Sequence, residues 1–254
     1  HLATYGDTSF DVDYEKILRQ AEKEADIIIW DGGNNDFPFF KSDLQIVVVD
    51  PHRAGHELSY YPGETNFRMA DVIIINKIDS APKQNIKIIE DNIKKINPKA
   101  IVIKARSKII VDNPKFIKGK RVLLVEDGPT ITHGGMKFGA ATVAAKLYKA
   151  KEIINAKKYA VGSIKETYEK YKHLEKELPA MGYSKQQIKD LQETINKADC
   201  DIILDGSPVN LSRLIKINKP IVNVNYELEE VSKPNLNDVI KNFVKRIKIK
   251  RWEI

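Results

Sequence analysis

In the first third of the chain, a short apolar run is followed directly by a mostly polar tetrapeptide. Residues 72–75 are all branched and apolar, and Asn76, Lys77, Ile78 and Asp79 come directly after them. The carboxylate of Asp79 could accept two hydrogen bonds from guanine, whereas adenine lacks that donor pair and would leave the acid without a partner. The Lys77 stem could lie over the ring, and Asn76 could tie the loop. The spacing predicts a site for a nucleotide base; the alternative is a plain strand end and a polar turn.

Two further strand ends carry residues suited to a nucleotide. Asp31, Gly32 and Gly33 follow the apolar residues 27–30. An aspartate there could hold Mg²⁺ through its water shell, and the glycines would let the backbone approach a phosphate. Ser107 lies after the next predicted strand, at the place where G proteins carry a loop of small residues beside the same base. A plain strand-to-loop turn is the alternative reading of the Asp31 segment.

The segment 50–68 is dense in functional side chains. Arg53 and Arg68 could form paired hydrogen bonds with phosphate oxygens, and His52 and His56 could bind phosphate or shuttle protons. A metal site on the two histidines is not favoured, because a glycine between them and a proline before them oppose the helix that such a pair needs. The alternative is a polar surface loop without a role.

A glycine-rich loop follows the apolar residues 122–125 in the second half. Such a loop leading into a helix exposes backbone N–H groups that can bind an anion. The alternative is a structural turn with a buried histidine. The residues that we expect to hold phosphate groups, in this loop and after two other strands, are Asp127, Thr130, Thr132, His133, Gly134, Gly135, Lys165 and Arg213.

The elements that would position these residues alternate regularly. The predicted strands are uninterrupted apolar runs, which is typical of parallel strands covered on both faces. They cover residues 27–30, 46–49, 72–75, 100–103, 122–125, 202–204 and 221–224, and the predicted helices cover 14–24, 83–96, 137–148, 164–178, 185–197 and 237–248. This order predicts an α/β fold. Because Asn-Pro and Gly punctuate the segment before residue 122, we expect one domain over 1–118 and a second α/β domain over 119–254.

Composition narrows the classes of partner. Apolar residues make up 42% of the 254 residues and charged residues 30%, with a formal net charge of +7. This balance suits a globular protein with anionic partners. The lysines are spread over helix faces, so we expect no nucleic acid partner, although a nucleic-acid-binding module would show strongly salt-dependent binding. We see neither a signal peptide nor a membrane-spanning segment, and we expect a cytoplasmic location. The single cysteine excludes a disulfide framework.

A phosphate-binding P-loop is missing from the pattern. No G-x-x-x-x-G-K-[ST] stands in the chain. In P-loop folds this loop follows the first strand, and the segment before Ile27 is too short for a strand, a loop and a helix. We therefore expect the chain to be an N-terminally truncated piece of a longer P-loop protein. A loop lent by another subunit is the alternative, and a homodimer would be one such assembly.

Several long strings together resemble one known family. "DGGNNDFPFF", "VVVDPHRAGHE", "YYPGETNFRMADVIIINKID" and "VEDGPTITHGGMKFGA" are similar to the archaeal-type cyclic 2,3-diphosphoglycerate synthetases, which are also described as predicted GTPases. The resemblance implies a P-loop-NTPase-like layer lacking its P-loop here, and an ATP-dependent ligase with Mg²⁺ as cofactor. It implies that 2,3-diphosphoglycerate is closed to its cyclic anhydride. The guanine-type motif "NKID" leaves ATP or GTP open.

These expectations combine into one hypothesis for the site. Asn76, Lys77, Asp79 and Ser107 would hold the nucleotide, and Asp31 would hold Mg²⁺. The segment 50–68 and the loop around His133 would face one another across a cleft and hold the diphosphoglycerate. The residues expected to take part in catalysis are Asp31, His52, Arg53, His56 and His133. The rival hypothesis is a regulatory GTPase-like switch protein.

Overall fold

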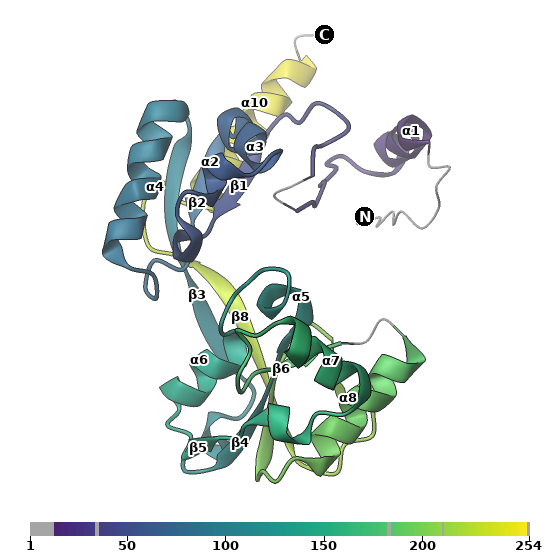
Figure 1. Ribbon diagram of the computed structural model, residues 1–254. Coiled ribbons are helices and arrows are strands. Elements are labelled where there is room, and N and C mark those ends of the chain that lie inside the picture. The colour runs from purple at the N-terminus through teal and green to yellow at the C-terminus, as the bar shows by residue number, and fades with distance from the viewer. Residues whose placement is uncertain (1–12, 34–35, 182–183, 210, 253–254) are drawn as a thin grey trace. The chain divides into compact units, whose positions relative to one another are not determined.

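The chain forms two compact units with a mixed α/β fold (Figure 1). The computed structural model describes residues 13–33, 36–181, 184–209 and 211–252. Unit 1 comprises residues 1–106 and 228–254, and unit 2 comprises residues 107–227. This division differs from the single boundary expected near residue 118. The chain passes between the units within two long strands, β3 (Ile101–Val111) and β8 (Ile221–Glu230), so its C-terminal part returns to unit 1.

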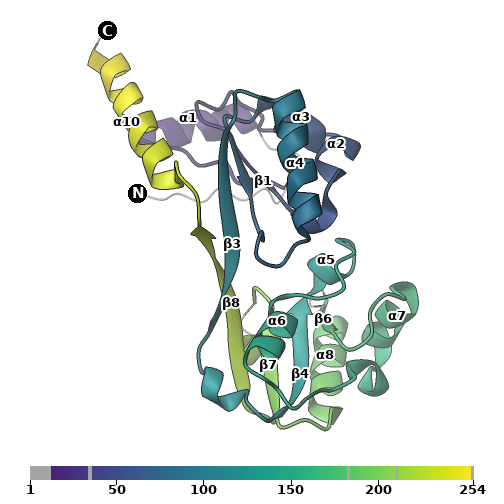
Figure 2. The same cartoon turned by 90° about the vertical axis from the view of Figure 1, so that its left-hand side faces the viewer.

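Unit 1 is built on parallel strands. β1 (Ile46–Val49) pairs with β2 (Val72–Ile75), and β2 pairs with the first part of β3. All four residues of β2 are buried. Figure 2 shows α4 (Lys83–Ile96) on one side of these strands and α10 (Leu236–Trp252) on the other. The buried apolar side chains form two clusters, because alternate strand residues point to opposite faces. Ile73 and Ile75 pack with residues of α4, and Val72 and Ile74 pack with Val239 of α10.

One predicted strand of unit 1 does not form. Residues 27–30 have no strand structure, and Ile27 and Ile29 are 56% and 78% exposed. An isolated apolar run cannot satisfy its backbone N–H and C=O groups as a strand unless a neighbouring strand pairs with it. In the described part of the chain no strand pairs with these residues. The expectation that Asp31 sits at a strand end is therefore wrong for this structure.

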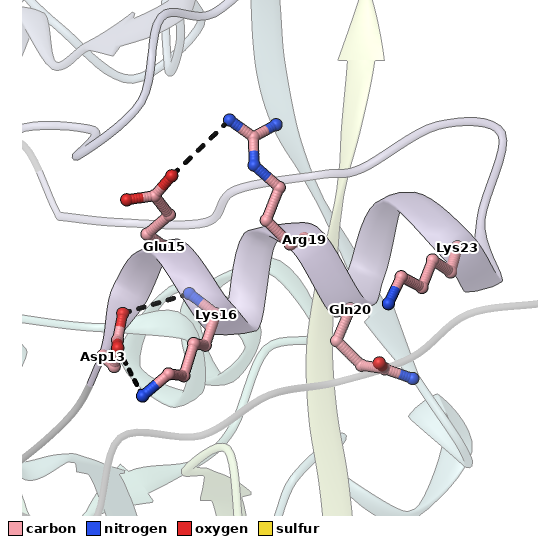
Figure 3. A pocket seen from close by; sticks show the side chains of 6 residues that line it. All are labelled: Asp13, Glu15, Lys16, Arg19, Gln20 and Lys23. Carbon is pink, nitrogen blue, oxygen red and sulfur yellow. Dashed lines mark hydrogen bonds and ion pairs between the residues drawn. The ribbon is translucent and has the colours of Figure 1, made fainter.

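The helix before that segment, α1 (Tyr14–Glu24), lies where the sequence predicts it and begins at the capping residue Asp13. A shallow hollow runs along its surface (Figure 3), lined by Asp13, Glu15, Lys16, Arg19, Gln20 and Lys23. Its side chains are joined by local ion pairs such as Asp13–Lys16 at 3.0 Å. Exposed pairs of this kind contribute little to stability. None of the predicted site residues lines this hollow.

A buried amide joins two elements of unit 1. Asn97, at the end of α4, donates from Nδ2 to the carbonyl oxygens of Phe67 at 3.0 Å and Ala70 at 2.8 Å. Both acceptors lie at the end of α3 (Gly63–Met69), and the last carbonyl groups of a helix have no partner within it.

Replacing Asn97 by alanine should destabilise unit 1. Asn97→Ala leaves two carbonyl groups without their donor, so the free energy of unfolding should fall by about 2 kcal/mol. Chemical denaturation followed by tryptophan fluorescence measures it, because both tryptophans of the chain belong to unit 1. Lys87→Ala removes an exposed ion pair. It should cost about 0.5 kcal/mol or less, as such pairs do. Equal effects of the two changes would contradict the prediction.

Unit 2 is a second layer of mostly parallel strands between helices. β4 (Arg121–Asp127) lies between β7 (Ile202–Gly206) and the short β5 (Glu152–Ile153) and β6 (Leu178–Ala180), and β7 pairs with β8. One core contains α6 (Ala140–Leu147), and the other contains α7 (Gly162–Lys170) and α8 (Lys185–Lys197). The two helical layers cover opposite faces of β4 (Figure 2).

Segments with a strong apolar or amphipathic pattern agree with the sequence, and several short segments were not predicted. The predicted bounds of β1, β2, α1, α4 and α8 match the structure, and α8 begins with a capping box formed by Ser184 and Gln187. β5, β6 and the short helices, among them α2 (His56–Ser59), α5 (Gly128–Ile131) and α9 (Leu211–Leu214), were not predicted. The helix predicted over 164–178 ends at Lys170, because Leu178 pairs with Val125 in β6. No helix in the described ranges has the length and apolar character that crossing a membrane requires.

Candidate functional site

In unit 1 two neighbouring parallel strands end in polar residues. Asp50 follows β1 and Asn76 follows β2, and the Asn76 N–H donates to the carbonyl oxygen of Val49 at 3.1 Å. The carboxyl ends of parallel strands are the usual place for ligands in open α/β sheets. Here Lys77 Nζ lies 2.8 Å from Asp50 Oδ2, so a lysine of one strand end pairs with the aspartate of the next.

The carboxylate of Asp50 collects donors from its surroundings. Its side chain is 13% exposed, and besides Lys77 it accepts from the His52 backbone N–H at 3.0 Å and from Arg53 Nη2 at 3.3 Å. Burial by itself raises the pKa of this carboxyl, but the Lys77 hydrogen bond and charge, with smaller contributions from His52 and Arg53, lower it below its usual value. Asp50 is therefore ionised at neutral pH.

The lowered pKa of Asp50 predicts a pH dependence of unit 1. Between the usual aspartate pKa of about 3.9 and the lower folded value, the unfolded chain binds more protons, so stability rises with pH in this window. Asp50 therefore adds stability above the unfolded pKa, and this is lost as the pH falls through the folded pKa. Between pH 5 and 2.5 the wild-type free energy of unfolding should fall more steeply than that of Asp50→Asn. Parallel acid curves, monitored by tryptophan fluorescence, would contradict this.

The predicted base motif forms a tight turn after β2. Lys77 has a φ of 54°, in the left-handed region, and its N–H donates to Asn76 Oδ1 at 2.8 Å. Asn76 thus ties the loop, as the sequence predicted. The Asp79 carboxylate is exposed, and its charge acts on Arg106, whose guanidinium pairs with Glu229 at 2.7 Å. An exposed carboxylate beside a fixed turn can accept hydrogen bonds from a ligand.

The segment after Asp50 is fastened to the same turn. His52 Nε2 lies 3.0 Å from Ser80 Oγ, and Asn85 Nδ2 donates to the carbonyl oxygen of Pro51 at 2.8 Å. These two contacts and the Lys77–Asp50 pair join the 3₁₀ turn Pro51–Arg53 to residues 76–85. His52 and Arg53, predicted to serve the substrate, thus lie beside the predicted base motif.

Other residues predicted for the site lie apart from this cluster or in a different setting. His56 is exposed on α2, with its ring 4.8 Å from that of Tyr60, and Arg68 pairs with Glu64 at 2.6 Å on α3. Asp31 is exposed in an irregular segment. We expected Ser107 in a loop, but it lies within β3, because that strand continues to Val111. In the described residues, no three His, Cys, Asp or Glu side chains come together as a metal site would require.

In unit 2 the central feature is Glu126 at the end of β4. Its side chain is fully buried and accepts from the N–H groups of Gly139, Ala141 and Thr142, and from Thr142 Oγ1 at 2.8 Å. Burial raises the pKa of Glu126, and these donors oppose the rise. A carboxylate of the chain itself thus caps the start of α6, where we expected an anion to bind. A Cβ at Gly139 would clash with Glu126 Oε2, which explains the glycine.

The glycine-rich loop satisfies its own donors. Thr132 Oγ1 donates to the Gly128 carbonyl at 2.6 Å, and the Gly134 N–H donates to the Pro129 carbonyl at 2.9 Å. Asp127 caps α5, accepting from the Thr130 N–H at 3.2 Å and from its hydroxyl. The Gly135 N–H donates to the Thr132 carbonyl at 3.2 Å.

The remaining predicted residues of unit 2 lie on the surface. His133 is exposed, with Nδ1 2.9 Å from the Tyr171 hydroxyl. Lys165, in the first turn of α7, and Arg213, on α9, are exposed as well.

Asp205, at the end of β7, is buried and accepts from Ser207 Oγ at 2.6 Å and from the Ser207 N–H at 3.0 Å. Burial raises the pKa of Asp205, and the hydrogen bonds from Ser207 oppose this rise.

Sequence reasoning missed the roles of Asp50 and Glu126. The sequence pattern includes Asp50 in the segment 50–68 without a separate role, and it singles out Asp127 and not the neighbouring Glu126. The available signal was the position of each acid directly after an apolar strand, where a parallel sheet gathers its polar residues. The partner of Asp50 is Lys77, which is distant in the sequence. The partners of Glu126 are mainly backbone N–H groups at the start of α6, which residue types do not reveal.

The known proteins to which the chain is similar are named synthetases. Residues 6–106 match the family model described as "Cyclic 2,3-diphosphoglycerate synthetase, P-loop domain". The chain is 64% identical over 234 residues, 92% of its length, to "Arginine synthetase ArcE" of Thermococcus kodakarensis. It is 33% identical over 49% of its length to the "Cyclic 2,3-diphosphoglycerate synthetase" of Thermococcus sibiricus, and 30% identical over 44% to that of Methanothermus fervidus.

These relatives are longer than the chain. The matched region spans 52% of the Thermococcus kodakarensis protein, 28% of the Thermococcus sibiricus protein and 24% of the Methanothermus fervidus protein. The recognised resemblance is therefore supported at the level of a P-loop synthetase domain, and the relative with the higher identity bears a different substrate name.

Proposed function

We propose that the chain is part of a nucleotide-dependent synthetase that forms a compound of the arginine type, and consumes it when the reaction runs in reverse. The observation that carries this proposal is the 64% identity over 92% of the chain to a protein named arginine synthetase. Unit 1, with Asn76, Lys77 and Asp79, holds ATP or GTP. The chemistry of a synthetase couples bond formation to the splitting of the nucleotide, with Mg²⁺ balancing the phosphate charge.

Carboxyl groups lie at the ends of two neighbouring strands of unit 2. Glu126 and Asp127 end β4, and Asp205 lies near the end of its neighbour β7. Glu126 and Asp205 are buried and accept donors of the chain itself, whereas Asp127 is partly exposed, so in this reading Asp127 is the carboxylate that can meet a guanidinium or an ammonium group. His133, in the glycine-rich loop, and Arg213, on α9, contribute polar groups of the same unit.

The second candidate is the cyclisation of 2,3-diphosphoglycerate at the expense of a nucleotide. It is favoured by the family description over residues 6–106 and by the two relatives of that name. In this reading Arg68, Lys165 and Arg213 neutralise the substrate, the loop around His133 adds donors, and His52, Arg53 and His56 take part in the transfer. Asp31 holds Mg²⁺ in both readings.

One assay series separates the candidates. The full-length protein containing this chain is incubated with Mg²⁺, arginine, phosphate and ADP or GDP, and nucleoside triphosphate formation is followed. In this reverse direction one guanidinium C–N bond is cleaved, its nitrogen leaves as ammonia or an amine, and the carbon takes up, as a ureido oxygen, the water released when phosphate joins the diphosphate. In parallel, 2,3-diphosphoglycerate is mixed with ATP or GTP and the cyclic product is followed by phosphorus NMR. Arginine-dependent triphosphate formation supports the first candidate, and cyclic product alone refutes it.

A third outcome bears on the regulatory GTPase alternative. Slow GTP hydrolysis that neither arginine nor 2,3-diphosphoglycerate changes would refute both synthetase candidates and support a switch protein. The two synthetase assays share the nucleotide site, so the Asp79→Asn variant serves as a common control for dependence on unit 1.

A further inference from the structure

We propose that Asp50 is a positioning residue for the base motif: its carboxylate holds the Lys77 ammonium at the end of β1 and so orients the turn of residues 76–79 toward the nucleotide. This inference rests on the proposed nucleotide site in unit 1. Asp50 does not contact the base itself and acts through Lys77.

The pair is better shielded than the exposed ion pair on α4. The side chains of Lys77 and Asp50 are 32% and 13% exposed, whereas those of Lys87 and Asp91 on α4 are 57% and 56% exposed. A pair with little access to water is weakly screened and holds its geometry. The contact between Lys77 Nζ and Asp50 Oδ2 therefore fixes the far end of the Lys77 side chain.

The near end of Lys77 is fixed as well. Its positive φ lies in the left-handed region. That conformation is costly for a residue with a Cβ, so the surrounding contacts must hold it. The Lys77 N–H donates to Asn76 Oδ1, and its carbonyl accepts from the Ser80 and Ala81 N–H groups at 3.2 and 3.1 Å. With both ends held, the Lys77 side chain has little freedom to move.

The ion pair with Asp50 determines which part of Lys77 can contact a base. Because Asp50 neutralises the ammonium, Lys77 offers a base its methylene groups. The hydrogen-bonding part of recognition then falls to Asp79, whose carboxylate is exposed. Ordering Lys77 before the ligand arrives lowers the entropic cost of binding.

A purely structural role for Asp50 is the competing explanation, since it also caps the Pro51–Arg53 turn through the His52 N–H. A double-mutant cycle distinguishes the two. In the full chain, the dissociation constants of fluorescent methylanthraniloyl derivatives of GTP and ATP are measured for wild type, Asp50→Asn, Lys77→Met and the double variant. Asp91→Asn, which breaks the exposed pair on α4, is the matched control.

The positioning role predicts a non-additive result. Asp50→Asn and Lys77→Met should each weaken binding about tenfold, and the double variant should bind no more weakly than Lys77→Met. Asp50→Glu, which keeps the charge, should bind better than Asp50→Asn and covers the case in which that variant folds poorly. Asp91→Asn should bind like wild type.

Different results would contradict the positioning role of Asp50 and the nucleotide site itself. Unchanged affinity in Asp50→Asn, or losses that multiply in the double variant, would overturn the positioning role. A wild-type chain that binds neither nucleotide derivative would instead overturn the nucleotide site on which the inference rests. Binding that responds to Asp79→Asn and not to Asp50→Asn rejects the inference and keeps the site.

Discussion

Replacing Glu126 by alanine should unfold unit 2 far more easily, lowering its free energy of unfolding by about 4 kcal/mol. The change removes the acceptor of three backbone N–H groups and one hydroxyl in a fully buried place. It also leaves a cavity between β4 and the start of α6. Amide hydrogen exchange of residues 139–142 and 202–206 under increasing denaturant measures the loss, because it reports on unit 2 alone.

Two further variants make this result specific. Glu126→Gln keeps the shape and one acceptor oxygen, so it should cost less than alanine. Glu193→Ala removes an exposed partner of Lys197 on α8. The loss of such an exposed pair should change stability by about 0.5 kcal/mol or less. If Glu126→Ala behaved like Glu193→Ala, the capping of α6 by Glu126 would not matter to stability.

Exchanging Asp79 for asparagine should abolish a preference for guanine nucleotides. In the proposed site the Asp79 carboxylate would accept from two donors of guanine. A hydrogen bond to a charged group contributes about 1.5–3 kcal/mol, so GTP should bind about 10- to 100-fold more weakly. ATP has no such donor pair, and its affinity should stay within about twofold. Equilibrium titration of both nucleotides against wild type and Asp79→Asn measures the two changes.

The control for this exchange is Asp91→Asn, which has the same chemistry on the exposed face of α4. It should leave both affinities unchanged. A wild-type chain that binds GTP and ATP equally, with no response to Asp79→Asn, would show that residues 76–79 are a strand end and turn without a base.

The clearest sequence predictions concern segments with strong local signals. α4 and α8 have amphipathic spacing over many residues, and β2 is an unbroken apolar run, so local preference and burial agree on their bounds. The turn at Asn76 follows from the same logic, because it closes directly after a buried strand. The α/β class follows from the alternation of these elements.

Residues 27–30 were predicted as a strand from their apolar run, and they do not form one. They have the same apolar run as β2, yet a strand also needs a partner along its edge, which the run itself cannot specify. β6 shows the reverse case, because Leu178–Ala180 carries a proline and becomes a strand only through its pairing with β4.

The amino-acid sequence alone determined the class of fold and the polar ends of β1 and β2, because these depend on neighbours in the chain. It also supplies the pattern of Asn76, Lys77 and Asp79, whose role in holding a base stays a prediction. Only the tertiary structure decided that Asp50 holds Lys77 and that Glu126 caps α6. Both acids find their partners across the sheet or at another element. Such pairings depend on register and on the path of the chain in space, which local spacing does not encode.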